Sequence, residues 1–145
     1  MKLLISACLL GLPCRYDGKS KPLPEDALAR LRAKFDLVPV CPEQLGGLPT
    51  PRTPSERRGA RVVMRSGEDV TAQYRRGAES TLEIARLTGA DAALLKERSP
   101  SCGKGTICDG SFTGTLTSGD GVTAEILRKA GFAVYGESEI DTLCK

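Results

Sequence analysis

Histidine is absent from this chain of 145 residues. Without an imidazole, Ser-His-Asp and Cys-His nucleophilic sites are excluded, and so is every metal site of mixed Cys and His ligands. The six cysteines form no C-x-x-C pair, which argues against a zinc ribbon and a thiol oxidoreductase. No G-x-x-x-x-G-K-[ST] phosphate loop is present either, so nothing in the sequence indicates ATP-dependent chemistry.

Long apolar runs are missing as well. No segment approaches the ~18 apolar residues that a membrane-spanning helix needs. The N-terminal run MKLLISACLLGLPC is short, is broken by Gly11 and Pro13, and is followed at once by Arg15 and Asp17. It therefore does not fit a secretory signal peptide, and we expect a soluble, cytoplasmic protein with no membrane partner.

The pattern that is present predicts one α/β domain over residues 1–145. Short apolar runs alternate with amphipathic segments, several of which stop at glycine. We expect strands at 2–9, 37–41, 91–96 and 132–135, helices at 24–35, 71–88 and 122–130, and a last helical turn within 139–145. This alternation predicts a mainly parallel, Rossmann-like sheet of about four strands with helices on both faces.

The connections between these elements are unusually long in two places. Residues 42–58 and 97–117 are expected to be loops, and a small hairpin is expected over 60–70, turning at Ser66-Gly67. Loops of such length in a compact domain are usually functional or disordered. The prolines of the first loop favour a structured, functional segment.

Three cysteines fall at the ends of predicted strands. Cys8 ends the first strand, Cys41 ends the second, and Cys102 follows the third by a few residues. Parallel strands direct their carboxyl ends to one edge of the sheet, where ligands bind, so we expect these three thiols to converge. Thiolates without imidazole favour an iron–sulfur cluster, and three ligands would leave one iron open for catalysis.

Alternatives stay open for each cysteine. Cys14 could be a fourth ligand, an alternative to Cys8, or a loop thiol. Cys108 and Cys144 lie further from the predicted edge and are interpreted as structural thiols. Any single cysteine could also be a small buried hydrophobic residue, as free cysteine often is, so only the shared strand-end position favours metal binding.

Polar and basic residues accompany the proposed ligands. Glu43 follows Cys41 by two residues, and Ser101 directly precedes Cys102. A carboxylate in a partly dry loop can act as acid or base, although a solvated loop carboxylate is the plainer interpretation of Glu43 alone. The net charge of +3 fits an anionic ligand without requiring nucleic acid, which is not an expected partner. A rim of basic residues that suits a phosphate, or simply solubility, comprises Arg15, Lys19, Arg52, Arg57, Arg58, Lys96, Arg98 and Lys104.

Three motifs, SACLLGLPCRYDG, CPEQLGGLPTPR and LLKERSPSCG, followed by DGSFTG, resemble the thiouracil desulfurase family (TudS). The resemblance runs from about Leu3 to Gly114. Members of that family hold a 4Fe–4S cluster on three cysteines, with the fourth iron free of protein ligands. They remove sulfur from thiolated uracils by hydrolysis, which gives uracil and hydrogen sulfide.

The resemblance implies a role for individual residues here. The cluster ligands would be Cys8, Cys41 and Cys102, and the open iron would bind the thiocarbonyl sulfur as a Lewis acid. Glu43 would activate water or pass a proton to the ring, and Ser101 would orient the substrate or relay that proton. The partner would be a small thiopyrimidine, free or as a nucleotide, and the leading candidate for binding its phosphate is Arg52.

Two other functions compete with this interpretation. An RNA sulfur-transfer enzyme would need to activate the base with ATP, and the sequence has no nucleotide loop for it. A non-catalytic metal- or cluster-binding module would need four ligands, with Cys14 included.

Overall fold

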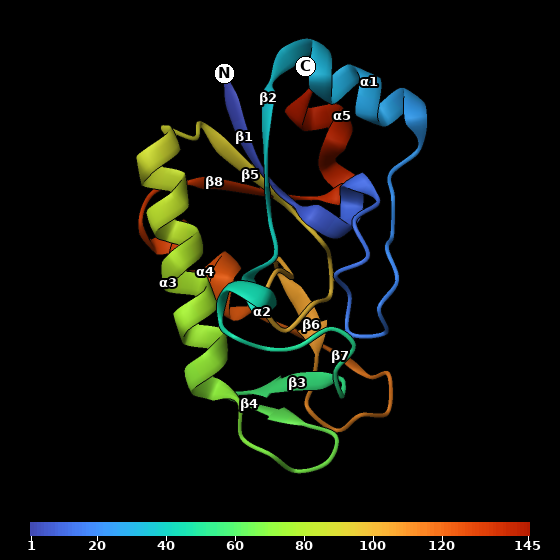
Figure 1. The fold of residues 1–145 in the computed structure, drawn as a ribbon, viewed down its shortest axis with the longest axis vertical. Coiled ribbons are helices and arrows are strands. Elements are labelled where there is room, and N and C mark those ends of the chain that lie inside the picture. Colours follow the sequence, from blue (N-terminus) through green and yellow to red (C-terminus); the bar gives the residue numbers. More distant parts are fainter.

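Four parallel strands form the central sheet of the computed structural model, which describes residues 1–145 (Figure 1). Their order across the sheet is β2 (Asp36–Val40), β1 (Lys2–Ser6), β5 (Ala92–Leu95) and β8 (Ala133–Gly136). The strand β1 pairs with β2 from Lys2 to Ser6 and with β5 from Leu3 to Ile5. The predicted parallel sheet of about four strands is therefore confirmed, with β1 and β5 at its centre.

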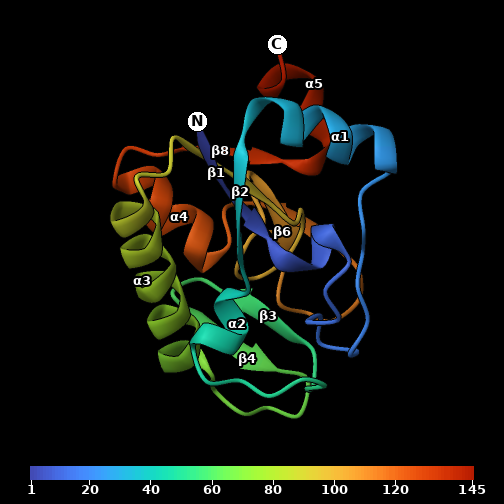
Figure 2. The same ribbon diagram turned by 45° about the horizontal axis from the view of Figure 1, so that its top comes forward.

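Helices cover both faces of this sheet (Figures 1 and 2). On one face Leu3 and Ile5 of β1 pack with Leu31, and on the other Leu4 packs with Leu127. Successive side chains of a strand point to opposite faces, so β1 contributes to both cores. The first face carries α1 (Glu25–Lys34) and α5 (Ile140–Leu143), and the second carries α3 (Thr71–Thr88) and α4 (Val122–Lys129).

The residues at the helix ends explain where these helices begin and stop. Acidic Glu25 and Asp26 lie in the first turn of α1, and basic residues lie in its last turn, which suits the helix dipole. The helix α3 ends at Gly89, whose φ of 69° is left-handed and whose N–H bonds the Ala85 carbonyl. Glycine adopts this conformation without a steric penalty, so α3 stops where the sequence predicts. None of the helices is both long and apolar enough to cross a membrane.

The first strand is shorter than predicted. It ends at Ser6, and a 3₁₀ helix, η1 (Ala7–Leu10), follows it. Cys8 therefore lies in this turn, just beyond the strand. A short apolar run does not distinguish a buried strand from a buried helical turn. The strand predicted from the sequence therefore ran on to Leu9.

Both long loops contain secondary structure that the sequence did not predict. The first includes α2 (Pro42–Leu45) and β3 (Ser55–Arg58), and the second includes the antiparallel pair β6 (Thr106–Cys108) and β7 (Leu116–Ser118). Strand β3 pairs with β4 (Arg61–Met64). These strands are short and partly polar, so no alternating pattern marks them.

The small hairpin predicted over 60–70 is present, and β3 adds a second hairpin before it. Val63 and Asp69 form an antiparallel bridge, and the N–H groups of Met64 and Val70 donate to the carbonyls of Glu68 and Val62, with the turn at Ser66-Gly67. The β3–β4 hairpin, which the sequence did not predict, turns at Gly59, where φ is 59°. The β3–β4 and β6–β7 hairpins lie beyond the carboxyl ends of the central strands (Figures 1 and 2). At the end of the chain, η2 (Glu137–Glu139) joins β8 to α5.

The short helix α2 lies directly against the backbone of α3. A Cβ atom at Gly77 would overlap the Pro42 carbonyl oxygen, and one at Gly46 would overlap the Gln73 carbonyl oxygen. Two backbones can approach this closely only where neither residue has a side chain. The contact fixes the orientation of α2, and with it the direction of Glu43 in its first turn.

The substitution Gly77→Ala tests this packing. Alanine is more favourable than glycine inside a helix by roughly 1 kcal/mol, so helix propensity alone predicts a more stable protein. We expect the overlap with Pro42 to reverse that sign and to lower the free energy of unfolding by about 1–3 kcal/mol, as measured by urea denaturation. Glu79→Ala, on the exposed face of α3, is the control and should change it by less than about 0.5 kcal/mol. A stabilised Gly77→Ala protein would contradict the packing.

Candidate active site

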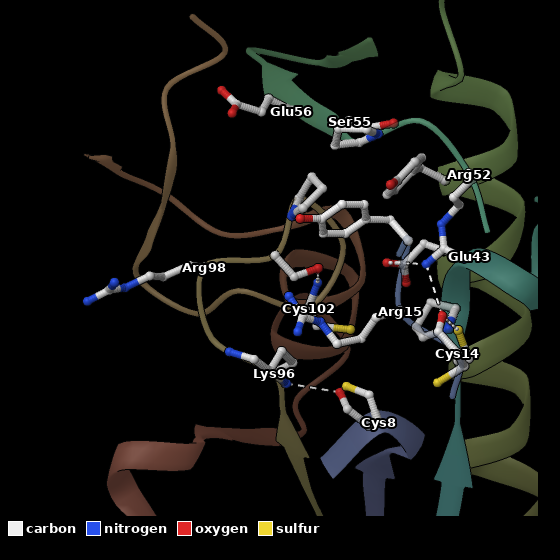
Figure 3. A pocket seen from close by; sticks show the side chains of 18 of the residues that line it. Cys8, Cys14, Arg15, Glu43, Arg52, Ser55, Glu56, Lys96, Arg98 and Cys102 are labelled. Carbon is white, nitrogen blue, oxygen red and sulfur yellow. Dashed lines mark hydrogen bonds and ion pairs between the residues drawn. The ribbon is translucent and has the colours of Figure 1, made fainter. Parts of the chain in front are cut away.

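A cavity of about 360 Å³ opens at the carboxyl edge of the sheet (Figure 3). Its walls come from η1, the loop after it, α2, β3 and the loop after β5. The structure brings Cys8, Cys41 and Cys102 to this cavity, as the parallel strands predict, and Cys14 lines it as well. These four thiols, from three segments of the chain, thus line one cavity.

Cys14 and Cys41 are neighbours in this wall. The Cys41 Sγ donates a hydrogen bond to the Cys14 carbonyl oxygen at 3.7 Å. The pKa of Cys14 is raised to about 11: its hydrogen bond with Cys41 lowers the value, but the hydrogen bond with Cys8, burial and the charge of Glu43 together outweigh it. The hydrogen bond with Cys14, burial and Glu43 raise the pKa of Cys41 as well. The Cys14 thiol is therefore close enough to both Cys8 and Cys41 for each of them to affect its pKa.

Cys102 is the most enclosed of the cavity thiols. Burial, and then the charge of Glu43, raise its pKa above the ordinary range, although the Ser6 and Ser101 hydroxyls oppose the shift. Its backbone N–H donates to Ser99 Oγ at 3.0 Å, which fixes the loop after β5. The raised pKa values of Cys14, Cys41 and Cys102 favour their protonated thiols, and a bound cationic metal would favour the thiolate forms.

The two remaining cysteines, Cys108 and Cys144, lie in different parts of the molecule. Cys108, on β6, lines the same cavity, contrary to its expected position far from the predicted edge. The β6–β7 hairpin places it there, and the sequence held no signal for that hairpin. Cys144 packs partly buried against the core beside α1 and α5, away from the cavity.

Glu43 and Arg52 form a buried ion pair beside the thiols (Figure 3). The Arg52 Nη2 lies 3.5 Å from Glu43 Oε2, and the two side chains are 3% and 14% exposed. Burial raises the pKa of Glu43, and the positive charge of Arg52 opposes that rise. Glu43 is thus an enclosed carboxyl group and not the solvated loop carboxylate of the plainer interpretation.

Arg52 also connects two loops. Its Nη2 donates to the Cys14 carbonyl oxygen at 3.2 Å, and its Nη1 donates to the Pro49 carbonyl oxygen and to Thr50 Oγ1. Both terminal nitrogens are therefore engaged within the protein, which leaves Arg52 little capacity for the substrate phosphate expected of it. Its position suits holding Glu43 and the Cys14 backbone in place.

Ser101 lies behind the cavity wall. Its side chain is fully buried, and its Oγ is 2.7 Å from Thr123 Oγ1 of α4. The backbone N–H groups of Thr123 and Ala124 both donate to the Ser101 carbonyl oxygen. The N-terminus of α4 thus fixes Ser101 next to Cys102, while the cavity itself is lined by its neighbours Pro100 and Cys102.

Sequence reasoning missed several residues of the cavity. Tyr74 of α3, Ser55 and Glu56 of β3, and Arg65 all line it. Tyr74 belongs to the apolar stripe of α3, which predicts a core position but not a cavity wall. The β3–β4 hairpin brings the other three, and no feature of the sequence indicated how it would fold over the sheet edge.

Comparison with known proteins identifies the family to which these features belong. The family model described as 2-thiouracil desulfurase matches residues 3–139. The chain belongs to the 2-thiouracil desulfurase family. This confirms the resemblance noted in the motifs, and it makes the chain an enzyme of the thiouracil desulfurase class.

Two relatives match this desulfurase over nearly its whole length. Uncharacterized protein YbbK of Bacillus subtilis (strain 168) is 42% identical over 151 residues, which cover 97% of this chain and 99% of YbbK. A solved structure, the [4Fe-4S]-dependent thiouracil desulfidase TudS, is 48% identical and has a TM-score of 0.93, covering 98% of this chain and 94% of that one. The α/β fold is therefore the fold of that desulfidase.

The donor set of this desulfurase fits an iron–sulfur cluster better than a single metal ion. No three of its Cys, Asp or Glu side chains lie close enough together to hold one ion. A cluster instead distributes its cysteine ligands over separate irons. The thiols of Cys8, Cys14, Cys41 and Cys102, gathered around one cavity without any imidazole, match that requirement.

Removal of Arg52 tests the ion pair. Arg52→Met keeps much of the side-chain length but leaves Glu43 enclosed without its partner, so we expect a loss of about 3 kcal/mol in the free energy of unfolding. The control is Arg61→Met, which breaks the exposed pair with Asp69, 67% and 43% exposed, and should cost at most about 1 kcal/mol. Adding Glu43→Gln to Arg52→Met should recover part of the loss. Equal losses at Arg52 and Arg61, in chemical denaturation, would contradict a structural role for the buried pair.

Proposed function

We propose that this desulfurase hydrolyses thiolated uracil to uracil and hydrogen sulfide, with a 4Fe–4S cluster on Cys8, Cys41 and Cys102. The observation that carries the proposal is one cavity that joins these thiols to a buried carboxyl group, in a chain of the 2-thiouracil desulfurase family. The dependence of the 48% identical TudS on a [4Fe-4S] cluster supports the choice of cofactor.

The three proposed ligands come from the ends of three neighbouring strands. Cys8 follows β1, Cys41 follows β2, and Cys102 lies in the loop after β5. Cys14 is the alternative to Cys8, because its thiol interacts with both Cys8 and Cys41. Three ligands from rigid strand ends would leave one iron without a protein ligand, as the proposed chemistry requires.

The overall reaction exchanges the ring sulfur for the oxygen of water and needs no electron donor. When bound, the cluster would supply a Lewis acid for the thiocarbonyl sulfur. Glu43 takes a proton from the attacking water or gives one to the ring, and its enclosed position with a raised pKa suits either transfer. Arg52 keeps that carboxyl group oriented. Ser101, held by Thr123 beside Cys102, assists by orienting the site or relaying a proton.

The substrate is a small thiopyrimidine, and the outer part of the cavity suits one that carries a phosphate. Arg15, Arg65 and Arg98 line the cavity, and Arg65 and Arg98 are exposed. Figure 3 shows Arg98 extending away from the thiols. Arginines bind phosphate through charge-assisted hydrogen bonds, so these three, more than Arg52, would contact the phosphate of a nucleotide substrate.

Five single substitutions test the ligand set and the activity. Cys8→Ser, Cys41→Ser and Cys102→Ser should each abolish iron binding and the anaerobic release of sulfide and uracil from thiouracil, because a hydroxyl does not replace a thiolate on iron. Cys108→Ser and Cys144→Ser should keep both. Cys108 is the sharper control, since it lines the same cavity. A Cys8→Ser protein with a full complement of iron and sulfide would assign Cys14 in its place, and absence of iron in the wild-type protein would refute the cofactor.

Glu43→Gln separates proton transfer from cluster binding. We expect the variant to keep its cluster and visible absorption but to lose about 10²–10⁴-fold in turnover, the usual contribution of a general acid or base. Ser101→Ala should lose less, because water can often replace a hydroxyl. Sulfide release is measured in the steady state and normalised to iron content. Turnover within a few-fold of wild type would remove Glu43 from the mechanism, and poor cluster retention would make it a ligand.

A further inference from the structure

The cavity has an unpaired hydroxyl in its wall. Among all buried side-chain nitrogen and oxygen atoms, Ser55 Oγ alone has no hydrogen-bond partner. Ser55 is the first residue of β3 and lines the cavity, and Figure 3 shows it with Glu56 on the side opposite Cys8 and Cys14. A buried hydroxyl without a partner lowers stability, and such groups in native proteins usually have a functional explanation.

Tyr74 provides a second hydroxyl to the same region. It lies on α3, is 3% exposed and lines the cavity. Its pKa is raised, first by burial and then by the charge of Glu43, while the nearby Ser55 hydroxyl opposes the rise. The two hydroxyls are close enough for Ser55 to affect the pKa of Tyr74, but no hydrogen bond of ordinary geometry joins them. Tyr74 thus lies near Glu43, and Tyr74 and Ser55 line the same wall of the cavity.

The chemistry of a thiouracil ring matches this pair. Besides its thiocarbonyl, the ring carries a carbonyl, which accepts hydrogen bonds, and ring N–H groups, which donate them. A hydroxyl can both donate and accept. A ring whose sulfur faces the thiol wall has to present its remaining polar edge to other groups, and burial of that edge without partners would weaken binding.

We propose that Tyr74 and Ser55 bind the carbonyl and N–H edge of the pyrimidine ring and so direct its sulfur toward Cys8, Cys41 and Cys102. This inference rests on the proposed function, since it takes a thiopyrimidine as the substrate. It makes the two residues specificity determinants: they distinguish a uracil-type ring from other thiocarbonyl heterocycles. In this orientation Glu43, which lies near Tyr74, is beside the bound pyrimidine ring.

The test uses the holoenzyme variants Tyr74→Phe and Ser55→Ala with two ligands. One is 2-thiouracil, and the other is 2-mercaptopyrimidine, which has the same sulfur site but lacks the ring carbonyl. Each variant should raise the KM for 2-thiouracil about three- to tenfold, the effect of one lost hydrogen bond, with kcat within about twofold. The inhibition constant of 2-mercaptopyrimidine as a competitor should change much less. Tyr135→Phe, on β8 and away from the residues that line the cavity, should change neither constant.

Stability gives an independent readout. Ser55→Ala removes a hydroxyl that has no partner, so the thermal midpoint of the variant should equal or exceed that of wild type at matched iron content. Weaker substrate binding together with unchanged or higher stability supports a ligand-binding hydroxyl. A clear fall in the midpoint, or an equal change for both ligands, would overturn the proposal.

Calorimetry under anaerobic conditions separates this proposal from the proposed function. If wild-type protein binds 2-thiouracil but releases no sulfide, the desulfuration proposal fails, and the affinities of the two variants still decide the ring site. If wild-type protein releases sulfide and the variants bind 2-thiouracil as tightly as it does, only the ring site is refuted.

Discussion

Thiols and a carboxyl group are enclosed together in the wall of one cavity, and a single arginine is paired with that carboxyl group. Burial and a neighbouring thiol raise the pKa values of Cys14, Cys41 and Cys102, and the negative charge of Glu43 raises them further; in Cys14 the hydrogen bond with Cys41 opposes the rise. Arg52 is the buried cation in contact with Glu43. A protein in which these groups are ionised needs further positive charge, and iron would supply it, so cluster binding and proton release are coupled.

The surrounding backbone is arranged to hold those groups in position. The helix α2 begins directly after Cys41, and the glycine contact fixes it on α3. Arg52 joins the Cys14 loop to α2, and α4 fixes the loop that carries Ser101 and Cys102. Catalytic groups act efficiently only when supporting contacts limit their freedom. The same cavity therefore combines unfavourable electrostatics with rigid packing around it.

The parts of the site that could be predicted from the sequence are those that depend only on topology. Carboxyl ends of parallel strands meet at one edge whatever the loops do, so the convergence of Cys8, Cys41 and Cys102 followed from recognising three strands. Cys108 and Ser55 depend on hairpins whose short, partly polar strands lack a period-two pattern. Arg52 looked like a member of a basic rim, because sequence does not show which arginine the tertiary fold encloses.

Tyr74 illustrates a different limit. Helical periodicity correctly predicts that it faces inward, and its 3% exposure agrees. Periodicity does not say whether an inward residue meets packed side chains or the wall of a cavity. That outcome depends on the β3–β4 hairpin folding over α3, a contact between segments that no local pattern describes.

Three departures from local physical rules occur at this edge of the molecule, and a further one, the positive φ of Phe112, lies outside the cavity lining. An unpaired hydroxyl at Ser55, an enclosed carboxyl group at Glu43 and a left-handed backbone at Arg98, with φ of 66°, all occur among the residues that line the cavity. Every other buried side-chain nitrogen and oxygen has a partner. Departures of this kind lower stability and persist at functional sites. Their concentration around the thiols, and on the wall opposite them, agrees with the two proposed roles of the cavity, sulfur chemistry on one side and ring recognition on the other.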